Sequence, residues 1–277
     1  MKKFVEFIII LLVVLITIIS VLLYVQPKMF FFPWHDRDSY SKLLTNNNFT
    51  EIKIDNDGNL ISGWIYHNVP NTSAPLLIFF GGNAQNTSNT CINFLNTNTY
   101  RYFEGYNIMF IDYPGYGLSE GKTSDKTMFD TALKSYDYAT TLDFVDKNNI
   151  IVLGYSIGTG VATYVASQRN VNGLILIAPY DEALSLYNNT LNIFHGPLKV
   201  LARYKFSSLS YAPNVNVYPL IITSEDDEVI NYKLSINLSN YFKIVEKVVL
   251  LENVGHNYYF SQQSVLENIY HYLQKRL

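Results

Sequence analysis

Residues 150–168, IIVLGYSIGTGVATYVASQ, place one serine between a short apolar run and a run of helix-compatible residues. The first four residues are typical of a buried strand, and the residues after the serine are typical of a helix. At a tight strand-to-helix turn, side chains at Gly154 and Gly158 would collide with the neighbouring strand and helix. The pattern Gly-x-Ser-x-Gly at this junction therefore predicts that Ser156 is a nucleophile held in a strained backbone conformation.

From residue 49 onward, short apolar runs alternate with helical periodicity. The runs without polar alternation predict strands that are buried on both faces, and they cover residues 76–80, 108–111, 150–153, 174–177, 220–222 and 248–251. Helical spacing predicts helices over residues 128–139, 161–168 and 261–275. The predicted fold class is α/β, with a mostly parallel central sheet and helices on both faces.

A hairpin is predicted before these parallel strands. Residues 51–54 and 60–66 flank Asp57-Gly58, a strong signal for a tight turn between antiparallel strands. We expect this hairpin to form one edge of the sheet.

A serine hydroxyl needs a base that removes its proton and a carboxylate that orients the base. His256 follows the last predicted strand, and Asp227 follows the strand before it. Both lie at carboxyl ends of strands, where sites on parallel sheets form. The order Ser156, Asp227, His256 therefore predicts a catalytic triad. The other histidines lack this placement; they are His35, His67, His195 and His271.

The loop that carries the acid contains four consecutive carboxylates, residues 225–228. Three of them fit an ordinary solvated loop. Asp226 is the alternative to Asp227 as the orienting carboxylate.

Backbone N–H donors are also needed to stabilise a developing oxyanion. One is predicted to be the N–H of Ile157, directly after the serine. The second is predicted to be the N–H of Asn83, in the sequence Gly81-Gly82-Asn83-Ala84 that follows the first buried strand. An ordinary Gly-Gly turn is the alternative interpretation of this loop.

The amino-terminal segment predicts a membrane anchor. After Lys2 and Lys3, residues 4–25 are almost wholly apolar, and a helix needs roughly 20 such residues to cross a bilayer. The length of this run and its poor cleavage site favour an uncleaved anchor over a signal peptide. The aromatic run at residues 29–34 fits either the membrane interface or packing of the linker onto the domain.

Orientation follows from the basic residues on either side of the anchor, although Lys28, Arg37 and Lys42 partly balance Lys2 and Lys3. We expect a single-pass membrane protein with its amino terminus in the cytosol and its catalytic domain on the extracytoplasmic side.

Three parts are predicted along the chain: an anchor at 1–27, a membrane-proximal linker at 28–48 and a catalytic domain at 49–277. Residues 180–218 break the strand-helix rhythm with a longer apolar segment. Excursions of this length are usually functional, and we interpret this one as a cap-like insertion over the site. An ordinary outer helix is the alternative.

Composition excludes some classes of protein. The 277 residues carry a net charge of -3, and the basic residues are scattered, so no nucleic-acid partner is expected. Cys91 is the single cysteine and can form neither an internal disulfide nor a structural zinc site. No metal or organic cofactor is implied, and nothing in the pattern predicts an oligomeric state.

Together these motifs resemble the Bem46-like α/β-hydrolases, in which a short amino-terminal membrane anchor precedes a hydrolase domain. The matching segments are residues 80–84, 112–121, 154–160, 227–230 and 255–257. The resemblance favours Asp227 over Asp226 as the acid and implies that residues 112–121 form a tight turn beside the site. The family usually has His-Gly-Asn-Ala at the oxyanion loop, whereas Gly81 stands at the His position here and removes a side chain that would help to pin the loop.

The resulting hypothesis is a serine hydrolase that cleaves an ester or thioester through an acyl-Ser156 intermediate. An anchor together with an apolar cap favours a lipid-like acyl substrate over other small molecules, although an anchor can serve location alone. Peptidases and acyltransferases use the same triad, and this fold hosts many chemistries. The competing hypothesis from another class is a catalytically silent hydrolase fold that acts as a membrane-tethered binding module.

Overall fold

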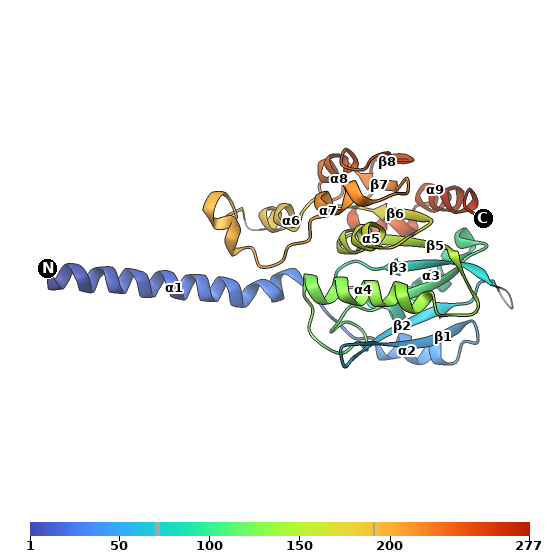
Figure 1. Cartoon of the computed structure of the whole chain (residues 1–277), viewed down its shortest axis with the longest axis horizontal. Helices are drawn as coiled ribbons and strands as arrows, with labels where there is room; N and C mark the ends of the chain where they lie inside the picture. The colour runs from blue at the N-terminus through green and yellow to red at the C-terminus, as the bar shows by residue number, and fades with distance from the viewer. Residues whose placement is uncertain (70–72, 191) are drawn as a thin grey trace.

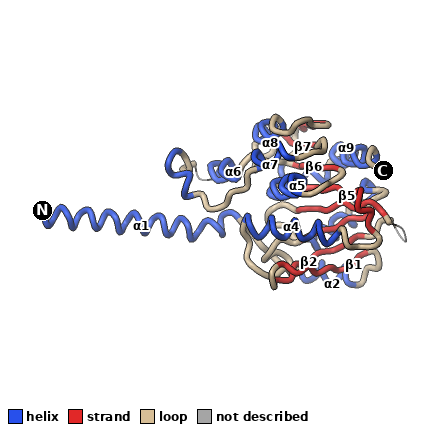
Figure 2. The backbone as a smooth tube through the Cα atoms, viewed as in Figure 1, coloured by secondary structure: helices blue, strands red, loops and turns tan. Residues whose placement is uncertain are grey.

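A computed structural model describes residues 1–69, 73–190 and 192–277. In this part of the chain the strands form one eight-stranded sheet in the order β1-β2-β4-β3-β5-β6-β7-β8. Figure 1 shows helices on both faces of the sheet, and Figure 2 shows the same layers by secondary structure. The predicted α/β class is confirmed.

The strands are β1 (Phe49–Asn56), β2 (Asn59–Tyr66), β3 (Ala74–Phe80), β4 (Asn107–Ile111), β5 (Val145–Tyr155), β6 (Gly173–Ile177), β7 (Leu220–Ser224) and β8 (Lys247–Leu251). The α-helices are α1 (Lys2–Phe30), α2 (Arg37–Leu44), α3 (Thr87–Asn96), α4 (Asp125–Ala139), α5 (Ile157–Gln168), α6 (Ala183–Thr190), α7 (Ser208–Tyr211), α8 (Tyr232–Ser239) and α9 (Gln263–Gln274). Short 3₁₀ helices are η1 (Thr99–Phe103), η2 (Gly196–Leu201), η3 (Ala212–Asn214) and η4 (His256–Ser261).

The hairpin β1-β2 lies at one edge of the sheet, as predicted, and β2 pairs antiparallel with β4. Its turn residues have φ values of 55° at Asp57 and 83° at Gly58. Two successive left-handed residues give the turn that matches the twist of a hairpin, which explains the Asp-Gly sequence. From β4 to β8 all the pairings are parallel.

The central strands carry the core. Every residue of β4, β6 and β7 is buried, because helices cover both faces there. The prediction of burial on both faces is wrong for β8, where Val248 is 36% and Leu250 is 44% exposed. This strand ends the sheet, and the side chains on one of its faces have no helix over them.

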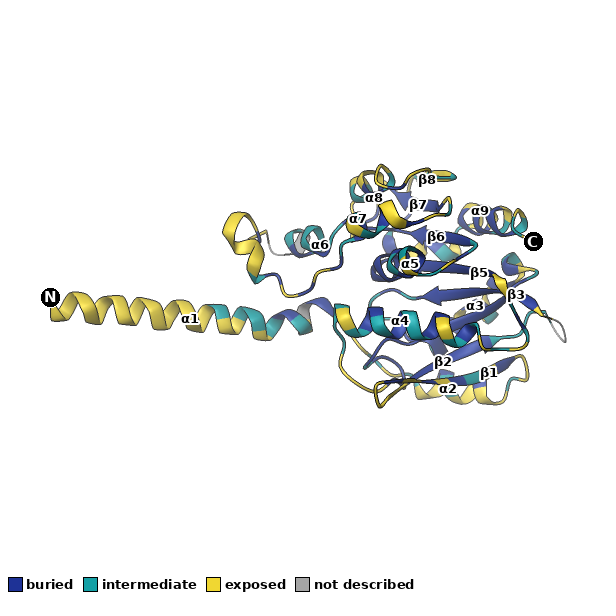
Figure 3. Ribbon diagram, viewed as in Figure 1, coloured by how far each residue is buried: buried dark blue, intermediate teal, exposed yellow. Residues whose placement is uncertain are grey.

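Helix α1 extends away from the sheet and is exposed along most of its length (Figure 3). Its segment Lys2–Lys28 is long and apolar enough to cross a membrane, so the helix is a candidate transmembrane span. The helix continues through Pro27 to Phe30, and α2 forms within the predicted linker, where the Asp36 side chain caps it by accepting from the Ser39 N–H.

The segment predicted as a cap contains α6, η2, α7 and η3. Helices α6 and η2 lie beside the last turns of α1 (Figure 1). The Gln26 side chain joins α1 to the end of η2 and the residues that follow it. Its Nε2 donates to the Leu201 carbonyl at 2.8 Å, and its Oε1 accepts from the Arg203 N–H at 2.8 Å. Residue 191 of this segment, and residues 70–72 of the predicted domain, lie outside the described residues.

Candidate active site

Ser156 lies at the sharp turn between β5 and α5. Its φ of 53° and ψ of -121° are unusual for a residue with a side chain, and this is the strain that the Gly-x-Ser-x-Gly pattern predicts. A Cβ at Gly154 would collide with main-chain atoms of α5, and one at Gly158 would collide with the Phe80 carbonyl at the end of β3. Both glycines are therefore needed for the close packing of α5 and β3 around the serine turn.

The structure brings Ser156, His256 and Asp227 together from loops at the carboxyl ends of three strands. Nε2 of His256 lies 2.9 Å from the Ser156 hydroxyl oxygen. Nδ1 of the same ring lies 2.8 Å from Oδ2 and 3.0 Å from Oδ1 of Asp227. All three residues are buried, so water competes little for these contacts.

The environment of Asp227 favours its charged form. Oδ1 accepts hydrogen bonds from the backbone N–H groups of Val229 at 2.9 Å and Ile230 at 2.7 Å, and Oδ2 accepts one from the Tyr259 hydroxyl at 2.9 Å. Burial raises the pKa of Asp227, but the contact with His256 and the two backbone donors outweigh burial, and the pKa is lowered overall.

The alternative acid lies elsewhere. Asp226 accepts a hydrogen bond from the Asn253 N–H at 2.6 Å, and the neighbouring Glu228 accepts one from the His256 N–H at 2.9 Å. These two carboxylates bind backbone N–H groups of the loop that carries His256. Among the described contacts of residues 225–228, the one with a His256 ring nitrogen is made by Asp227.

The loop at residues 81–84, hereafter the GGNA loop, passes directly over the serine turn. A Cβ at Gly82 would lie 2.9 Å from the Tyr155 ring and 3.4 Å from Cβ of Ser156. Within the described residues, neither the Asn83 N–H nor the Ile157 N–H donates to a protein acceptor. The described hydrogen bonds thus leave these two backbone donors, on segments that adjoin the serine, without a protein acceptor.

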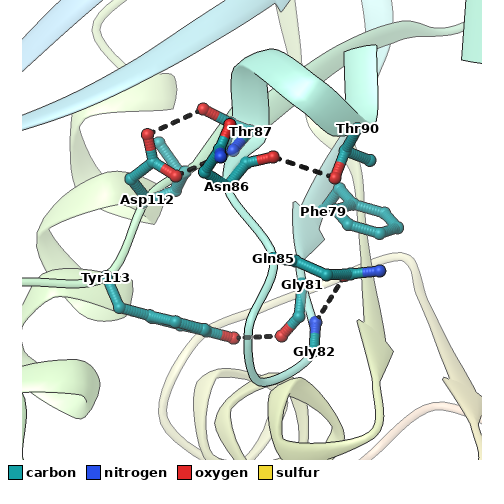
Figure 4. A pocket seen from close by; sticks show the side chains of 10 residues that line it. Phe79, Gly81, Gly82, Gln85, Asn86, Thr87, Thr90, Asp112 and Tyr113 are labelled. Atoms are coloured by element: carbon teal, nitrogen blue, oxygen red, sulfur yellow. Dashed lines mark hydrogen bonds between the residues drawn. The ribbon is translucent and has the colours of Figure 1, made fainter. Parts of the chain in front are cut away.

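Two side chains that sequence reasoning missed hold the GGNA loop from the inside (Figure 4). Oε1 of Gln85 accepts from the Gly82 N–H at 2.7 Å, and the Tyr113 hydroxyl donates to the Gly81 carbonyl at 2.9 Å. A Cβ at Gly81 would meet Oε1 of Gln85 at 3.1 Å, so the glutamine fills the space above this glycine. Gln85 therefore pins the loop that lacks a side chain at position 81.

Asp112 anchors the turn at residues 112–121 behind this loop. It is buried, and its carboxylate accepts from the Thr87 N–H at 2.8 Å and the Thr87 hydroxyl at 2.9 Å, as Figure 4 shows. Burial raises the pKa of Asp112 to about 6, although these hydrogen bonds oppose the rise. Gly117, with a φ of 53°, leaves room for the carboxylate that a Cβ would displace.

Tyr259 was also missed, although its position carried a signal. It follows His256 by three residues on η4, and this spacing returns a side chain to the same face of a 3₁₀ helix. Among the described residues, no group of three or more His, Cys, Asp or Glu side chains is arranged to hold a metal ion.

Comparison with known proteins places the chain among related sequences. The alpha/beta hydrolase fold family matches residues 75–211. The chain is 27% identical over 151 residues to alpha/beta hydrolase domain-containing protein aho-3 of Caenorhabditis elegans, a match that covers 54% of this chain and 44% of that protein. It is 27% identical over 181 residues to human alpha/beta hydrolase domain-containing protein 17C, covering 65% of this chain and 52% of that protein. The chain thus spans about half the length of these two relatives.

Solved structures show the same fold. Est1E from Butyrivibrio proteoclasticus, with ferulic acid bound, has a TM-score of 0.66 at 20% identity and covers 81% of this chain and 98% of its own. The Pyrococcus furiosus esterase Pf2001 has a TM-score of 0.69 at 16% identity, and the match covers 88% of this chain and 96% of the esterase chain. The chain therefore has the α/β-hydrolase fold, and this agrees with the resemblance of its motifs to the Bem46-like α/β-hydrolases.

Proposed function

We propose that the protein is a serine hydrolase that cleaves an ester or thioester through an acyl-Ser156 intermediate. The observation that carries the proposal is the continuous contact from the Ser156 hydroxyl through both ring nitrogens of His256 to Asp227. A serine, a histidine and a buried carboxylate in this geometry form the arrangement that activates a hydroxyl.

In the first half-reaction, Nε2 of His256 takes the Ser156 proton as the oxygen attacks the acyl carbonyl carbon. The tetrahedral oxyanion is stabilised by the N–H groups of Ile157 and Asn83. The imidazolium then returns the proton to the departing alcohol or thiol, and the acyl group stays on Ser156. Asp227 holds the proton on Nδ1 throughout and stabilises the imidazolium.

In the second half-reaction, water replaces the alcohol. His256 removes a proton from the water, whose oxygen attacks the acyl-serine carbonyl. Collapse of the second tetrahedral intermediate breaks the bond to the Ser156 oxygen, which recovers its proton from His256. The products are a carboxylic acid and the free enzyme, so atoms and charge balance without a cofactor.

The proposed substrate is an acyl ester or thioester of lipid-like character. The support is positional: the segment that leaves α1 contacts Asn83, and η2 is joined to the same helix through Gln26. The proposed reaction centre therefore lies at the end of the domain from which the apolar helix emerges. A peptidase would use the same triad, but this apolar setting favours an acyl chain.

Labelling with a fluorophosphonate tests the nucleophile. The wild-type chain is expected to react with one equivalent of probe, whereas Ser156→Ala is expected to stay unlabelled; Ser261→Ala, an exposed serine beyond His256, is the matched control. Equal labelling of wild type and Ser156→Ala contradicts the mechanism and favours a silent binding module.

A series of p-nitrophenyl esters tests the substrate class. We expect kcat/KM to rise from the acetyl to the octanoyl ester, and a preference for acetyl would count against a lipid-like acyl group. Hydrolysis of peptides but not of esters would identify a peptidase.

We also propose that α1 spans the membrane with its amino terminus in the cytosol and the domain on the extracytoplasmic side, where the linker of 28–48 leads into the domain of 49–277. A reporter enzyme fused after Leu277 tests the orientation. Activity of a reporter that functions only in the cytosol would overturn it.

A further inference from the structure

The side chain of Asn83 is bound to the segment that leaves α1. Its Nδ2 donates to the Phe30 carbonyl at 2.7 Å, and its Oδ1 accepts from the Phe32 N–H at 3.0 Å. The same oxygen accepts from the Tyr116 hydroxyl at 2.6 Å and from the Ala84 N–H at 3.0 Å. One amide thus makes hydrogen bonds to the anchor helix end, the 112–121 turn and its own loop.

The following residues of this segment are attached to the same loops. Nε1 of Trp34 donates to the Ala84 carbonyl at 2.5 Å, and the Trp34 carbonyl accepts from the Gly117 N–H at 3.1 Å. Nδ1 of His35 also contacts the Gly117 carbonyl. We call residues 30–35 the exit segment; it lies along the GGNA loop and the 112–121 turn.

The start of the exit segment is embedded in the predicted cap. Phe30 stacks on Tyr187 with ring centroids 4.9 Å apart, and Phe31 meets Tyr204 edge-on at 4.6 Å. Both phenylalanines are buried. Phe30 and Phe31 therefore pack onto the domain, which is one of the two interpretations of the aromatic run at residues 29–34.

We propose that the exit segment is a positioning element of the active site, which fixes the direction of the Asn83 N–H by binding the Asn83 side chain. The proposal rests on the serine-hydrolase function proposed above. The Asn83 peptide lies between two fixed points: Gln85 holds Gly82 from the inside, and the exit segment holds the Asn83 amide from the outside.

The physical reason is preorganisation. A backbone donor stabilises an oxyanion strongly only if it already points at the position where the charge develops. Without partners at Phe30 and Phe32, the Asn83 side chain would turn to water, and the loop would adopt several orientations of its N–H groups. Loss of this orientation would mainly destabilise the transition state and so lower kcat, because the neutral carbonyl oxygen of the bound ester accepts a weaker hydrogen bond from the Asn83 N–H than the oxyanion does.

The test uses the full chain in one detergent, with p-nitrophenyl acetate as a water-soluble substrate that does not depend on a bilayer. Phe32→Pro removes the N–H that donates to Oδ1 of Asn83 and, at 3.1 Å, to the Tyr116 hydroxyl oxygen. Phe32→Ala keeps this N–H and removes only the exposed ring. Asn83→Leu keeps the Asn83 N–H but removes all four side-chain hydrogen bonds, to Phe30, Phe32, Tyr116 and Ala84. Arg37→Pro is the matched proline control, at the first position of α2, where an N–H has no helical partner.

We expect Phe32→Pro and Asn83→Leu each to lower kcat by roughly 10- to 100-fold, below the loss of about 10²–10³ for a deleted donor, with KM changed by less than about threefold. Phe32→Ala should be at least about tenfold more active than Phe32→Pro. The double variant should be no worse than the poorer single variant, because both remove the same coupling. The pH profile of kcat should keep its shape, since His256 is untouched, and the fluorophosphonate should still label to completion, only more slowly.

Two results would separate the failures. If Ser156→Ala abolishes turnover but Phe32→Pro and Asn83→Leu both keep kcat within about twofold, the positioning role is wrong and the serine mechanism stands. If Ser156→Ala turns over like wild type, the serine mechanism itself fails. A loss of kcat that is matched by incomplete labelling and a lower Tm would mean a folding defect and would also overturn the positioning role.

Discussion

The Tyr259 hydroxyl donates a 2.9 Å hydrogen bond to Oδ2 of Asp227, the same oxygen that lies 2.8 Å from Nδ1 of His256. Tyr259 and His256 both lie on η4, so the short helix that carries the proposed base also supplies a donor to its acid. Both oxygens of the Asp227 carboxylate therefore accept hydrogen bonds besides the contact with His256: Oδ1 from the backbone of Val229 and Ile230, and Oδ2 from Tyr259.

Tyr259→Phe removes this donor and keeps the ring in the core. We expect kcat for ester hydrolysis to fall about tenfold, because a hydrogen bond to a charged group is worth roughly 1.5–3 kcal/mol and part of this orients Asp227. Steady-state kinetics on a soluble ester measure the effect. Tyr258→Phe, at an exposed neighbouring position, is the control, and equal kcat for the two variants would mean that the bond plays no part in catalysis.

Asp227→Asn and Asp226→Asn distinguish the two neighbouring carboxylates. Asp227→Asn should lower kcat by about 10⁴, the size seen when the acid of such a triad is replaced by its amide. Asp226→Asn retains an oxygen that accepts from the Asn253 N–H, and its kcat should stay within about twofold. Similar losses in both variants would show that the acid was misassigned.

Asp112 predicts a pH dependence of stability. Its folded pKa of about 6 lies above the unfolded value of roughly 4, so the folded state binds the extra proton and stability from this group falls as pH rises between them. From pH 5 to pH 7 the wild type should lose about 1 kcal/mol more than Asp112→Asn, which cannot ionise. Thermal unfolding in detergent at both pH values measures the difference.

Asp227 does not confound that measurement. Its pKa is lowered in the fold, so its contribution is present above the unfolded value of roughly 4 and is lost only as pH falls through the folded value. The two carboxylates therefore act in separate pH windows. Parallel slopes for wild type and Asp112→Asn between pH 5 and 7 would contradict the raised pKa.

Gly158→Ala tests the packing of the serine turn. A methyl group there meets the Phe80 carbonyl, a main-chain atom that cannot rotate away, and we expect destabilisation of about 3 kcal/mol or more. Gly196→Ala is the control, since its Cβ meets nothing within 4 Å and its φ of 52° alone costs about 1–2 kcal/mol. A smaller loss of Tm at Gly158 than at Gly196 would be inconsistent with a steric cause.

Sequence reasoning succeeded where a local pattern has a single physical cause. Apolar runs marked the core strands, Asp57-Gly58 marked the hairpin turn, and the two glycines around Ser156 marked the strand-to-helix turn. It missed α3, whose sequence TSNTCINFLN is poor in strong helix formers and is held by its cap at Asn86 and by packing. It missed the exposure of β8 because an apolar run does not reveal its place in the sheet.

Contacts between distant positions were the least predictable part of the candidate site. Phe32 and Asn83 are 51 positions apart, and neither the aromatic run nor the GGNA loop indicates that the other is its partner. Gln85 likewise gave no signal, since only the folded loop shows that its amide takes the space above Gly81. Such contacts depend on the assembled fold rather than on periodicity or propensity.

Helix α1 is hydrogen-bonded to the domain at its carboxyl end, where Gln26 binds Leu201 and the Phe30 carbonyl accepts from Asn83. Within residues 1–69, which the structure describes, no flexible linker separates the helix from the domain at these contacts. In a bilayer, a domain mounted in this way would stand at a set height and tilt above the lipid surface instead of searching a hemisphere around its tether. Each residue added to the helix below Gln26 would raise the reaction centre by about 1.5 Å and turn it by about 100° around the helix axis. With α1 across the bilayer as proposed, the height of the reaction centre above the membrane would therefore depend on the length of the helix.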